Sequence, residues 1–375
     1  MNCYRKRVIA LILAVLFSLV LTGCDFSDLE KAVDINDKNI GTESKDELEI
    51  HFLDIGQGDS TLIRCGGNSM LIDAGGNGKG TWIRNYLKKH DVETLDYLIL
   101  THPDADHIDG AASIISNMDI AHVIMTDVEN DTRTYENMMN EISYKNITPM
   151  VPVAGDIFSL GSATVKILGP AKRYDNTNDS SIVTLITHGE NRFLFTGDCE
   201  EAAENDLVDL YGTDIKDINV YKAGHHGSKT ATSDVLISCI NPEYCVISCG
   251  EENVYGHPHA EVLNKLRTAG VMVFRTDEQG SIVAVSDGKE IKWNCSPSQT
   301  WKAGENVSHS VTEPPAATVP PSKFTYILNT NTRKIHMPGC VSVADMKEKN
   351  KAYTNQSIDE LEAEGYTKCR RCMGD

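Results

Sequence analysis

The sequence predicts an α/β fold in which two β-sheets pack face to face between outer helices, followed by a small metal-binding module. From Glu47 to Lys292, short apolar stretches typical of strands alternate with amphipathic stretches typical of helices. After this region the composition shifts to Pro, Ser and Thr, and cysteines then cluster near the C-terminus. These observations predict an αββα sandwich over residues 47–293, a linker over 294–323 and a separate module over 324–375.

Glycine-rich turns separate the predicted strands of the main domain. Strands are expected at residues 48–54, 61–65, 69–73, 95–101, 121–126, 163–168, 182–188, 191–196, 218–222 and 243–248. Helices are expected at residues 82–89, 134–144, 200–210 and 260–269. This mixture fits two sheets with helices on their outer faces.

The N-terminus has the features of a bacterial secretion signal. Residues 5–7 are basic, residues 8–20 are apolar, and Leu21-Thr22-Gly23-Cys24 follows. The apolar run is short for a transmembrane helix and has the flanks of a signal peptide. The tetrad resembles the lipobox of bacterial lipoproteins. That resemblance implies removal of residues 1–23 and lipidation of Cys24 outside the cytoplasmic membrane; the alternative is an ordinary signal with a chance cysteine.

The charge is unevenly distributed along the chain. Removing residues 1–23 deletes three positive charges and no acids, so the net charge falls from −19 to −22, and residues 24–46 then form a polar tether. Residues 323–375 carry nine Lys and Arg against seven Asp and Glu, or +2, which leaves about −24 on the rest. Such a surface repels polyanions at long range and argues against a broad nucleic-acid-binding face. A local cationic site built on metal ions remains compatible with it.

The strongest chemical signal lies in residues 101–110, directly after a predicted buried strand. Four potential ligands fall within six residues there: His102, Asp104, Asp106 and His107. Each offers a deprotonated nitrogen or oxygen, and a loop can turn all four inward. The spacing therefore predicts a metal site.

This His-x-Asp-x-Asp-His motif resembles a variant of the His-x-His-x-Asp-His signature of the metallo-β-lactamase superfamily. Further landmarks follow in the family's order: Asp73 and Asp198 at strand ends, the pair His225-His226, and Gly256-His257-Pro258-His259 before a helix. More narrowly, residues 51–60, 178–181 and 222–229 resemble the extracellular hydrolase domain of ComEC-type competence proteins. The long membrane channel of those proteins has no counterpart here, so the resemblance implies the hydrolase part only.

The resemblance implies a role for each matched position. Asp106 and His107 would hold one divalent metal, His102 and Asp104 the other, and Asp198 would bridge them. His257 is the expected last ligand, with His259 as the weaker alternative. Two metals about 4 Å apart polarise an ester oxygen and activate water near neutral pH.

Other matched side chains are expected to support the metals or the reaction. Asp73 would hydrogen-bond to the ligands. His225 or His226 would bind phosphate or protonate the leaving oxygen. Asp106 and Ser228 are further candidate catalytic residues.

Two departures from the family bear on the metal. Asp104 replaces the second histidine of the signature, and the ligand histidine expected before Asp198 is absent, with Asn178 and Ser181 there instead. Oxygen ligands favour harder ions, so Mn²⁺ is expected to rival Zn²⁺, with Mg²⁺ as a third alternative. The opposite interpretation is that both metals are lost.

The C-terminal module carries a second metal-binding pattern, His-x3-Cys-x28-Cys-x2-Cys. Its members are His336, Cys340, Cys369 and Cys372. Three thiolates and an imidazole complete a closed tetrahedral site of the structural zinc type; the alternative is a Cys369–Cys372 disulfide.

Residues 326–330 and 365–369 of this module are similar to the zinc-binding domain of Ada-type DNA-repair proteins. Cysteine fills all four positions there, and because His336 departs from that pattern, the methyl-acceptor role is not implied. Lys368, Arg370 and Arg371 offer a modest DNA contact or, equally, a solvated basic turn.

The sequence thus predicts a metal-dependent phosphodiesterase at the cell surface, a nuclease acting on extracellular DNA being the leading hypothesis. Expected partners are DNA or another phosphodiester polymer, the membrane through the lipid, and a DNA-uptake machinery. One alternative is an esterase acting on wall-polymer phosphodiesters or other small esters, since one fold hosts many chemistries. A non-catalytic alternative is a surface DNA- or wall-binding lipoprotein with structural metals, against which the intact Asp106, His107 and Asp198 count.

Overall fold

The computed structural model describes residues 47–76, 78–305, 326–337, 340–344 and 346–373. The predicted signal peptide, the tether and Cys24 lie outside the described residues, as do residues 306–323 of the predicted linker and the first two residues, 324 and 325, of the predicted module. Within the described segments, no helix combines the length and the apolar character needed to cross a bilayer.

The main domain contains two seven-stranded sheets. The first has the order β14-β13-β1-β2-β3-β4-β5, and β3, β4 and β5 run parallel to one another. Its strands are β1 (Leu48–Phe52), β2 (Thr61–Cys65), β3 (Asn68–Ile72), β4 (Thr94–Leu100), β5 (Asp119–Met125), β13 (Ile282–Ser286) and β14 (Ile291–Trp293).

The second sheet has the order β12-β11-β10-β9-β8-β7-β6, with β9 to β12 parallel. Its strands are β6 (Ile157–Leu160), β7 (Ala163–Gly169), β8 (Val183–His188), β9 (Asn191–Phe195), β10 (Val220–Lys222), β11 (Tyr244–Ile247) and β12 (Met272–Arg275). Parallel strands buried on both faces explain why these segments are almost continuously apolar.

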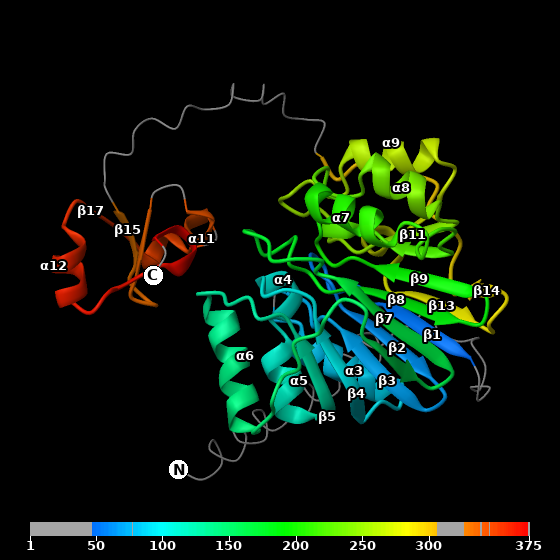
Figure 1. Cartoon of the computed structure of the whole chain (residues 1–375), viewed down its shortest axis with the longest axis horizontal. Coiled ribbons are helices and arrows are strands. Elements are labelled where there is room, and N and C mark those ends of the chain that lie inside the picture. The colour runs from blue at the N-terminus through cyan, green and yellow to red at the C-terminus, as the bar shows by residue number, and fades with distance from the viewer. Residues whose placement is uncertain (1–46, 77, 306–325, 338–339, 345, 374–375) are drawn as a thin grey trace, which may run out of the picture. The chain divides into compact units, whose positions relative to one another are not determined.

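Helices cover the outer face of each sheet (Figure 1). The first sheet packs against α3 (Gly80–Lys89), α5 (Ala111–Asn117) and α6 (Arg133–Tyr144). The second packs against α7 (Glu201–Tyr211), α8 (Asp234–Ile240) and α9 (Ala260–Thr268). Short helical turns, α4 (Ala105–Ile108), η1 (Gly224–Gly227) and α10 (Thr276–Gln279), lie at strand ends.

Alternation along the strands divides the apolar side chains between three cores. Ile63 of β2 belongs to the core between the sheets, whereas its neighbour Leu62 belongs to the core beneath α3, α5 and α6. The rings of Phe52 and Phe195 stack across the two sheets with their centroids 6.0 Å apart. This arrangement confirms the predicted αββα sandwich.

Residues 294–305 continue the main domain beyond its predicted end. The Ser298 N–H donates to the carbonyl of Val273 at 2.7 Å, and the Gly304 N–H donates to the carbonyl of Pro258 at 3.0 Å. This stretch is therefore bound to the domain surface, although its composition resembles that of a linker.

The C-terminal module forms a four-stranded sheet in the order β17-β15-β16-β18. Its elements are β15 (Tyr326–Asn329), β16 (Lys334–His336), α11 (Val341–Ala344), η2 (Glu348–Asn350), β17 (Lys351–Thr354), α12 (Ile358–Ala363), β18 (Thr367–Lys368) and α13 (Arg370–Met373). Ser357 and Glu360 form a capping box that starts α12, and Leu361 of that helix is fully buried against Ile335. The apolar core is small, which is typical of modules that depend on a metal.

Candidate metal centre

The candidate metal centre lies where strands of both sheets end. Asp73 follows β3, His102 follows β4, Asp198 follows β9, and η1 with its two histidines follows β10. Each of these strands runs parallel to a neighbour. Because the carboxyl ends of parallel strands meet at one edge of a sheet, loops that are distant in sequence converge there.

His107 is held by Asp73 from behind. Its Nδ1 lies 2.8 Å from Asp73 Oδ2, and a carboxylate can only accept, so Nδ1 carries the proton and Nε2 presents a lone pair. Asp73 also accepts hydrogen bonds from the backbone and the side chain of Thr101, both at 2.8 Å. These bonds fix the carboxylate, which in turn fixes the direction of the ring.

His226 is oriented in the same way. Its Nδ1 donates to the carbonyl of Ser248 at 3.1 Å, which leaves a lone pair on Nε2. That Nε2 lies 3.2 Å from Asp106 Oδ2 and 3.5 Å from Asp198 Oδ2. The sequence prediction placed His226 among the catalytic residues and left open that it could be the last ligand; this geometry places it among potential ligands.

Asp59, His107, Asp198 and His226 form a buried donor cluster, with one donor atom of each within 4.8 Å of the others. The donor atoms Asp59 Oδ1, His107 Nε2, Asp198 Oδ1 and His226 Nε2 have no hydrogen-bond partner. With its Nε2 unprotonated, His107 would place an acceptor only 3.2 Å from a second acceptor, Asp198 Oδ1. Buried acceptors that face each other are costly unless a cation lies between them. The donor set therefore fits a divalent metal.

The pKa shifts of the two buried histidines also indicate a site for a cation. Burial lowers the pKa of His107 and of His226, but the buried carboxylates, Asp198 foremost, outweigh it and raise the pKa of His107 well above its usual value and that of His226 to about 10. The cluster thus attracts positive charge strongly, and a divalent cation would replace these protons.

The sequence analysis did not name Asp59 or Lys222 as site residues. Lys222 Nζ donates to Asp59 Oδ2 at 2.9 Å, and both side chains are almost fully buried. Burial raises the pKa of the Asp59 carboxyl, but the ammonium of Lys222 outweighs it and holds that pKa well below its usual range. The signals available were the Gly58-Asp59-Ser60 motif and the lysine that opens residues 222–229.

His102 and Asp104 offer fewer donors than the cluster does. His102 Nδ1 lies 3.2 Å from Ser181 Oγ, and its Nε2 has no hydrogen-bond partner and lies 3.9 Å from Asp104 Oδ2. Asp104 is partly exposed and accepts hydrogen bonds from Asn130 and Thr177. Burial, followed by the neighbouring His107, lowers the pKa of His102, so its imidazole is neutral and suited to a metal. Among the described residues, His102 and Asp104 thus lie outside the donor cluster.

His225 lies beside the cluster and is partly exposed. Its Nε2 is 3.8 Å from Asp198 Oδ2, and its Nδ1 is 3.2 Å from Glu200 Oε1. Burial lowers its pKa, but Asp198 and Glu200 outweigh it, and the result is a pKa above the usual value. A protonated imidazole at the open side of the cluster can bind phosphate or supply a proton.

Three remaining predicted residues lie around the cluster. Asn178 Nδ2 donates to Glu200 Oε1 at 3.4 Å, and Ser181 Oγ accepts the N–H of Asp198 at 3.1 Å. Ser228 Oγ lies 3.0 Å from Thr230 Oγ1, which donates to the same Glu200 oxygen. Glu200, which the sequence analysis did not single out, thus connects His225 to its surroundings.

His257 and His259 lie outside the donor cluster. The ring centroid of His257 is 6.1 Å from that of His226 and 5.6 Å from that of His225, and Gln57 Nε2 lies 3.4 Å from His257 Nδ1. Burial, with the neighbouring histidines, lowers the pKa of His257 to about 3, so it stays neutral. His259 Nδ1 accepts the N–H of Lys229. Among the described residues, Asp59 and His226 belong to the donor cluster, whereas His257, the expected last ligand, does not.

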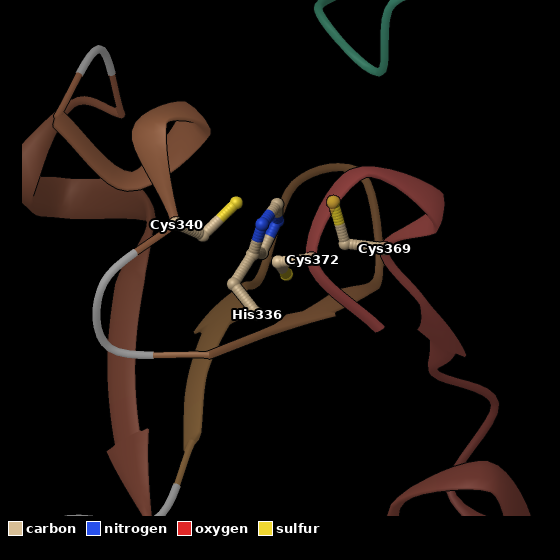
Figure 2. Close-up of side chains that lie close together, drawn as sticks. All are labelled: His336, Cys340, Cys369 and Cys372. Carbon is tan, nitrogen blue, oxygen red and sulfur yellow. The ribbon is translucent and has the colours of Figure 1, made fainter. Parts of the chain in front are cut away.

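In the C-terminal module, four side chains converge: His336 at the end of β16, Cys340 directly before α11, Cys369 directly before α13, and Cys372 within α13 (Figure 2). One donor atom of each lies within 4.8 Å of the others. Among the described residues, neither ring nitrogen of His336 has a hydrogen-bond partner, and none of the three cysteines forms a disulfide. Three thiols and a buried imidazole fit a closed zinc site.

The family model of the metallo-beta-lactamase superfamily matches residues 53–251. ComE operon protein 3 of Bacillus subtilis (strain 168) is 29% identical over 255 residues, which cover 63% of this chain and 33% of that protein. Recombination protein 2 of Haemophilus influenzae is 31% identical over 247 residues, or 64% of this chain and 29% of that protein. Competence protein ComA of Neisseria gonorrhoeae is 30% identical over 240 residues, which cover 64% of this chain and 32% of that protein.

The chain thus spans about a third of the length of these curated relatives. The resemblance that the motifs predicted is confirmed for the main domain.

Proposed function

The chain belongs to the metallo-β-lactamase superfamily, and from this premise we propose that it is a metal-dependent phosphodiesterase that cleaves DNA outside the cell. The observation that carries the proposal is the buried donor cluster with the partly exposed His225 at its side. A bound divalent metal would polarise the phosphoryl oxygen and lower the pKa of a water molecule.

The chain's own residues would position and neutralise the groups that react. Asp59, His107, Asp198 and His226 would hold the metal, while Asp73 and Ser248 keep the two rings aimed at it. His225, kept protonated by Asp198 and Glu200, would bind a non-bridging phosphate oxygen or give its proton to the leaving oxygen. His102 and Asp104 would hold a second, weaker metal.

DNA is the proposed substrate because two curated relatives carry competence or recombination in their names. The Ada-like module and the phosphate-oriented chemistry of His225 support this choice. Location outside the cell rests on the lipobox-like tetrad that ends at Cys24. A Cys24→Ser variant should then appear in the soluble fraction, whereas the unchanged chain stays with the membrane.

The decisive test uses the purified protein after metal removal and reconstitution with Mn²⁺ or Zn²⁺. We expect hydrolysis of DNA and of a generic phosphodiester, with Mn²⁺ at least equal to Zn²⁺ because oxygen ligands are frequent at the site. Asp198→Ala serves as the inactive control.

Turnover of a wall-polymer phosphodiester with none of DNA would replace the proposal by the esterase alternative. Full metal content without turnover of any ester would favour a binding protein with structural metals.

A further inference from the structure

The loop before His257 carries two adjacent side chains that are unusual beside a charged centre. Val254 is 93% exposed and Tyr255 is 58% exposed, although both are large and apolar or aromatic. Exposed large hydrophobic groups that lie together often mark a binding surface.

The loop is held rigidly. Asn253 Nδ2 donates to the carbonyls of Gly250 at 2.8 Å and His257 at 2.6 Å. Its Oδ1 accepts the N–H of Tyr255 at 3.2 Å and that of His257 at 3.0 Å. These bonds hold the backbone that carries Val254 and Tyr255, so a ligand does not have to order the loop.

Two ring-to-ring steps join Tyr255 to the metal centre. Its ring stacks on that of His257, with centroids 5.7 Å apart and planes at 23°. The ring of His257 lies in turn 5.6 Å from His225 and 6.1 Å from His226. An aromatic platform thus begins beside the residues proposed to engage the phosphate.

We propose that Tyr255 and Val254 form a subsite that stacks on a nucleobase of the DNA strand whose phosphodiester lies at the metal centre. The inference rests on the proposed function and adds the class of substrate that the site prefers. Aromatic side chains stack on the faces of unpaired bases without regard to sequence. Stacking needs no charge, which matters because residues 24–322, which include this loop, carry a net charge of about −24 and repel DNA at long range.

The subsite favours single strands and unpaired ends over duplex. Bases within a duplex are already stacked on each other and present only their edges, so Tyr255 has no face to contact there. A single strand presents base and phosphate together and satisfies both contacts.

The test compares 4-nitrophenyl phosphodiesters of thymidine, attached through the 5′ or the 3′ oxygen, with the matching esters of 1,2-dideoxyribose, which lack the base. With the metal-loaded full chain, we expect one thymidine isomer to be cleaved with a kcat/KM roughly tenfold higher than its baseless counterpart, the usual effect of stacking one base. Tyr255→Ala should reduce that ratio to about one. Tyr255→Phe should keep it, and neither variant should change the rate on the baseless ester or the metal content.

Tyr144→Ala is the matched control, because Tyr144 is an 80% exposed tyrosine at the end of α6 and should leave the ratio unchanged. A second measurement compares two fluorescently labelled oligonucleotides of equal length, one of thymidine and one without bases. Their binding to the protein is followed by fluorescence anisotropy.

Hydrolysis without any preference for the base would overturn the subsite and leave the proposed function standing. The protein could instead bind the thymidine oligonucleotide more tightly than the abasic one, lose this preference in Tyr255→Ala, and hydrolyse no ester. That result would overturn the proposed function and keep the subsite. Equal ratios in Tyr255→Ala and the unchanged protein would also refute the subsite.

Discussion

His225 and His226 are neighbours in sequence, but the turn that carries them directs their rings to different surroundings. Both residues adopt left-handed backbone angles, with φ of 47° and 55°, which non-glycine residues rarely do. His226 is buried among acceptors, whereas His225 stays partly open beside Glu200. Such strain persists only where the surrounding structure enforces it, and it often lies at functional sites.

The two histidines should therefore behave differently when removed. We expect both His226→Ala and Asp198→Ala to lose bound metal and turnover together, because each removes a donor from the same cluster. His225→Ala should lose turnover and retain most of the metal. Metal content by elemental analysis, measured beside the initial rate, separates these outcomes. Equal loss of metal in both histidine variants would contradict the assignment.

The Lys222–Asp59 pair allows a stability prediction. In Lys222→Met, the Asp59 carboxylate loses its main counter-charge while it stays buried, which should reduce the free energy of unfolding by about 3 kcal/mol. The control is Lys166→Met, which breaks a pair of the same 2.9 Å length between Lys166 and Asp214 at the surface. There we expect little or no change, since water replaces the partner. Urea unfolding of the metal-free proteins measures both, and equal midpoints would contradict the prediction.

At the scale of elements, the glycines before Asp59 allow two loops to touch. Gly58 has φ of 137°, and a β-carbon there would overlap the carbonyl oxygen of Asp106 at the start of α4. The Asp59 N–H donates to that same carbonyl at 3.0 Å. The glycine-rich motif thus joins the β1–β2 loop to the ligand loop, a structural role distinct from the phosphate binding typical of glycine-rich loops.

Gly58→Ala should accordingly reduce metal affinity as well as stability, because Asp106 and Asp59 must both move. The control is Gly67→Ala, a glycine with φ of 83° and no atom within 4 Å of the added carbon. It should cost about 1 kcal/mol of stability through its backbone angle alone and leave metal affinity unchanged. Thermal unfolding and a metal titration of both variants test this, and intact metal affinity in Gly58→Ala would refute it.

At the scale of the whole molecule, charge separates the module from the domain. Residues 323–375 carry a net charge of +2, whereas residues 24–322 carry about −24. A module of opposite sign on a Pro-rich connection can hold a polyanion near the centre and raise its effective concentration.

Truncation after residue 305, which keeps the segment bound to the domain, should raise KM on DNA and leave kcat nearly unchanged. A small chromogenic phosphodiester should be cleaved at the same rate by both proteins.

Cys340→Ser in the full chain should have the same effect on KM as the truncation if zinc maintains the module. DNA binding by the full chain should weaken steeply with salt. Equal KM values on DNA for the full and the truncated proteins would instead favour a wall- or protein-binding role for the module.

The sequence by itself determined the fold class of this protein. The alternation of strands and helices gives the αββα sandwich because each sheet must bury both faces, and periodicity is a local property that a sequence displays directly. Several short elements escaped prediction, namely the edge strands β6, β12 and β14, the internal strand β13, and the helices α5 and α8. Their apolar runs are too brief for a periodic signal, and pairing with neighbours decides their conformation.

The tertiary structure alone decided how the candidate site is composed. His102, Asp104, Asp106 and His107 stand out because they are close in sequence, and a strand end turns them inward. Asp59 and Lys222 are 163 positions apart, and their contact exists only because β1 and β10 end at the same edge of the sandwich.

Whether His226 or His257 serves as a metal ligand likewise depends on two quantities: the distance of the ring from the other donors, and which ring nitrogen is protonated. Neither quantity is local, because each follows from the position of a hydrogen-bond acceptor in another strand or loop.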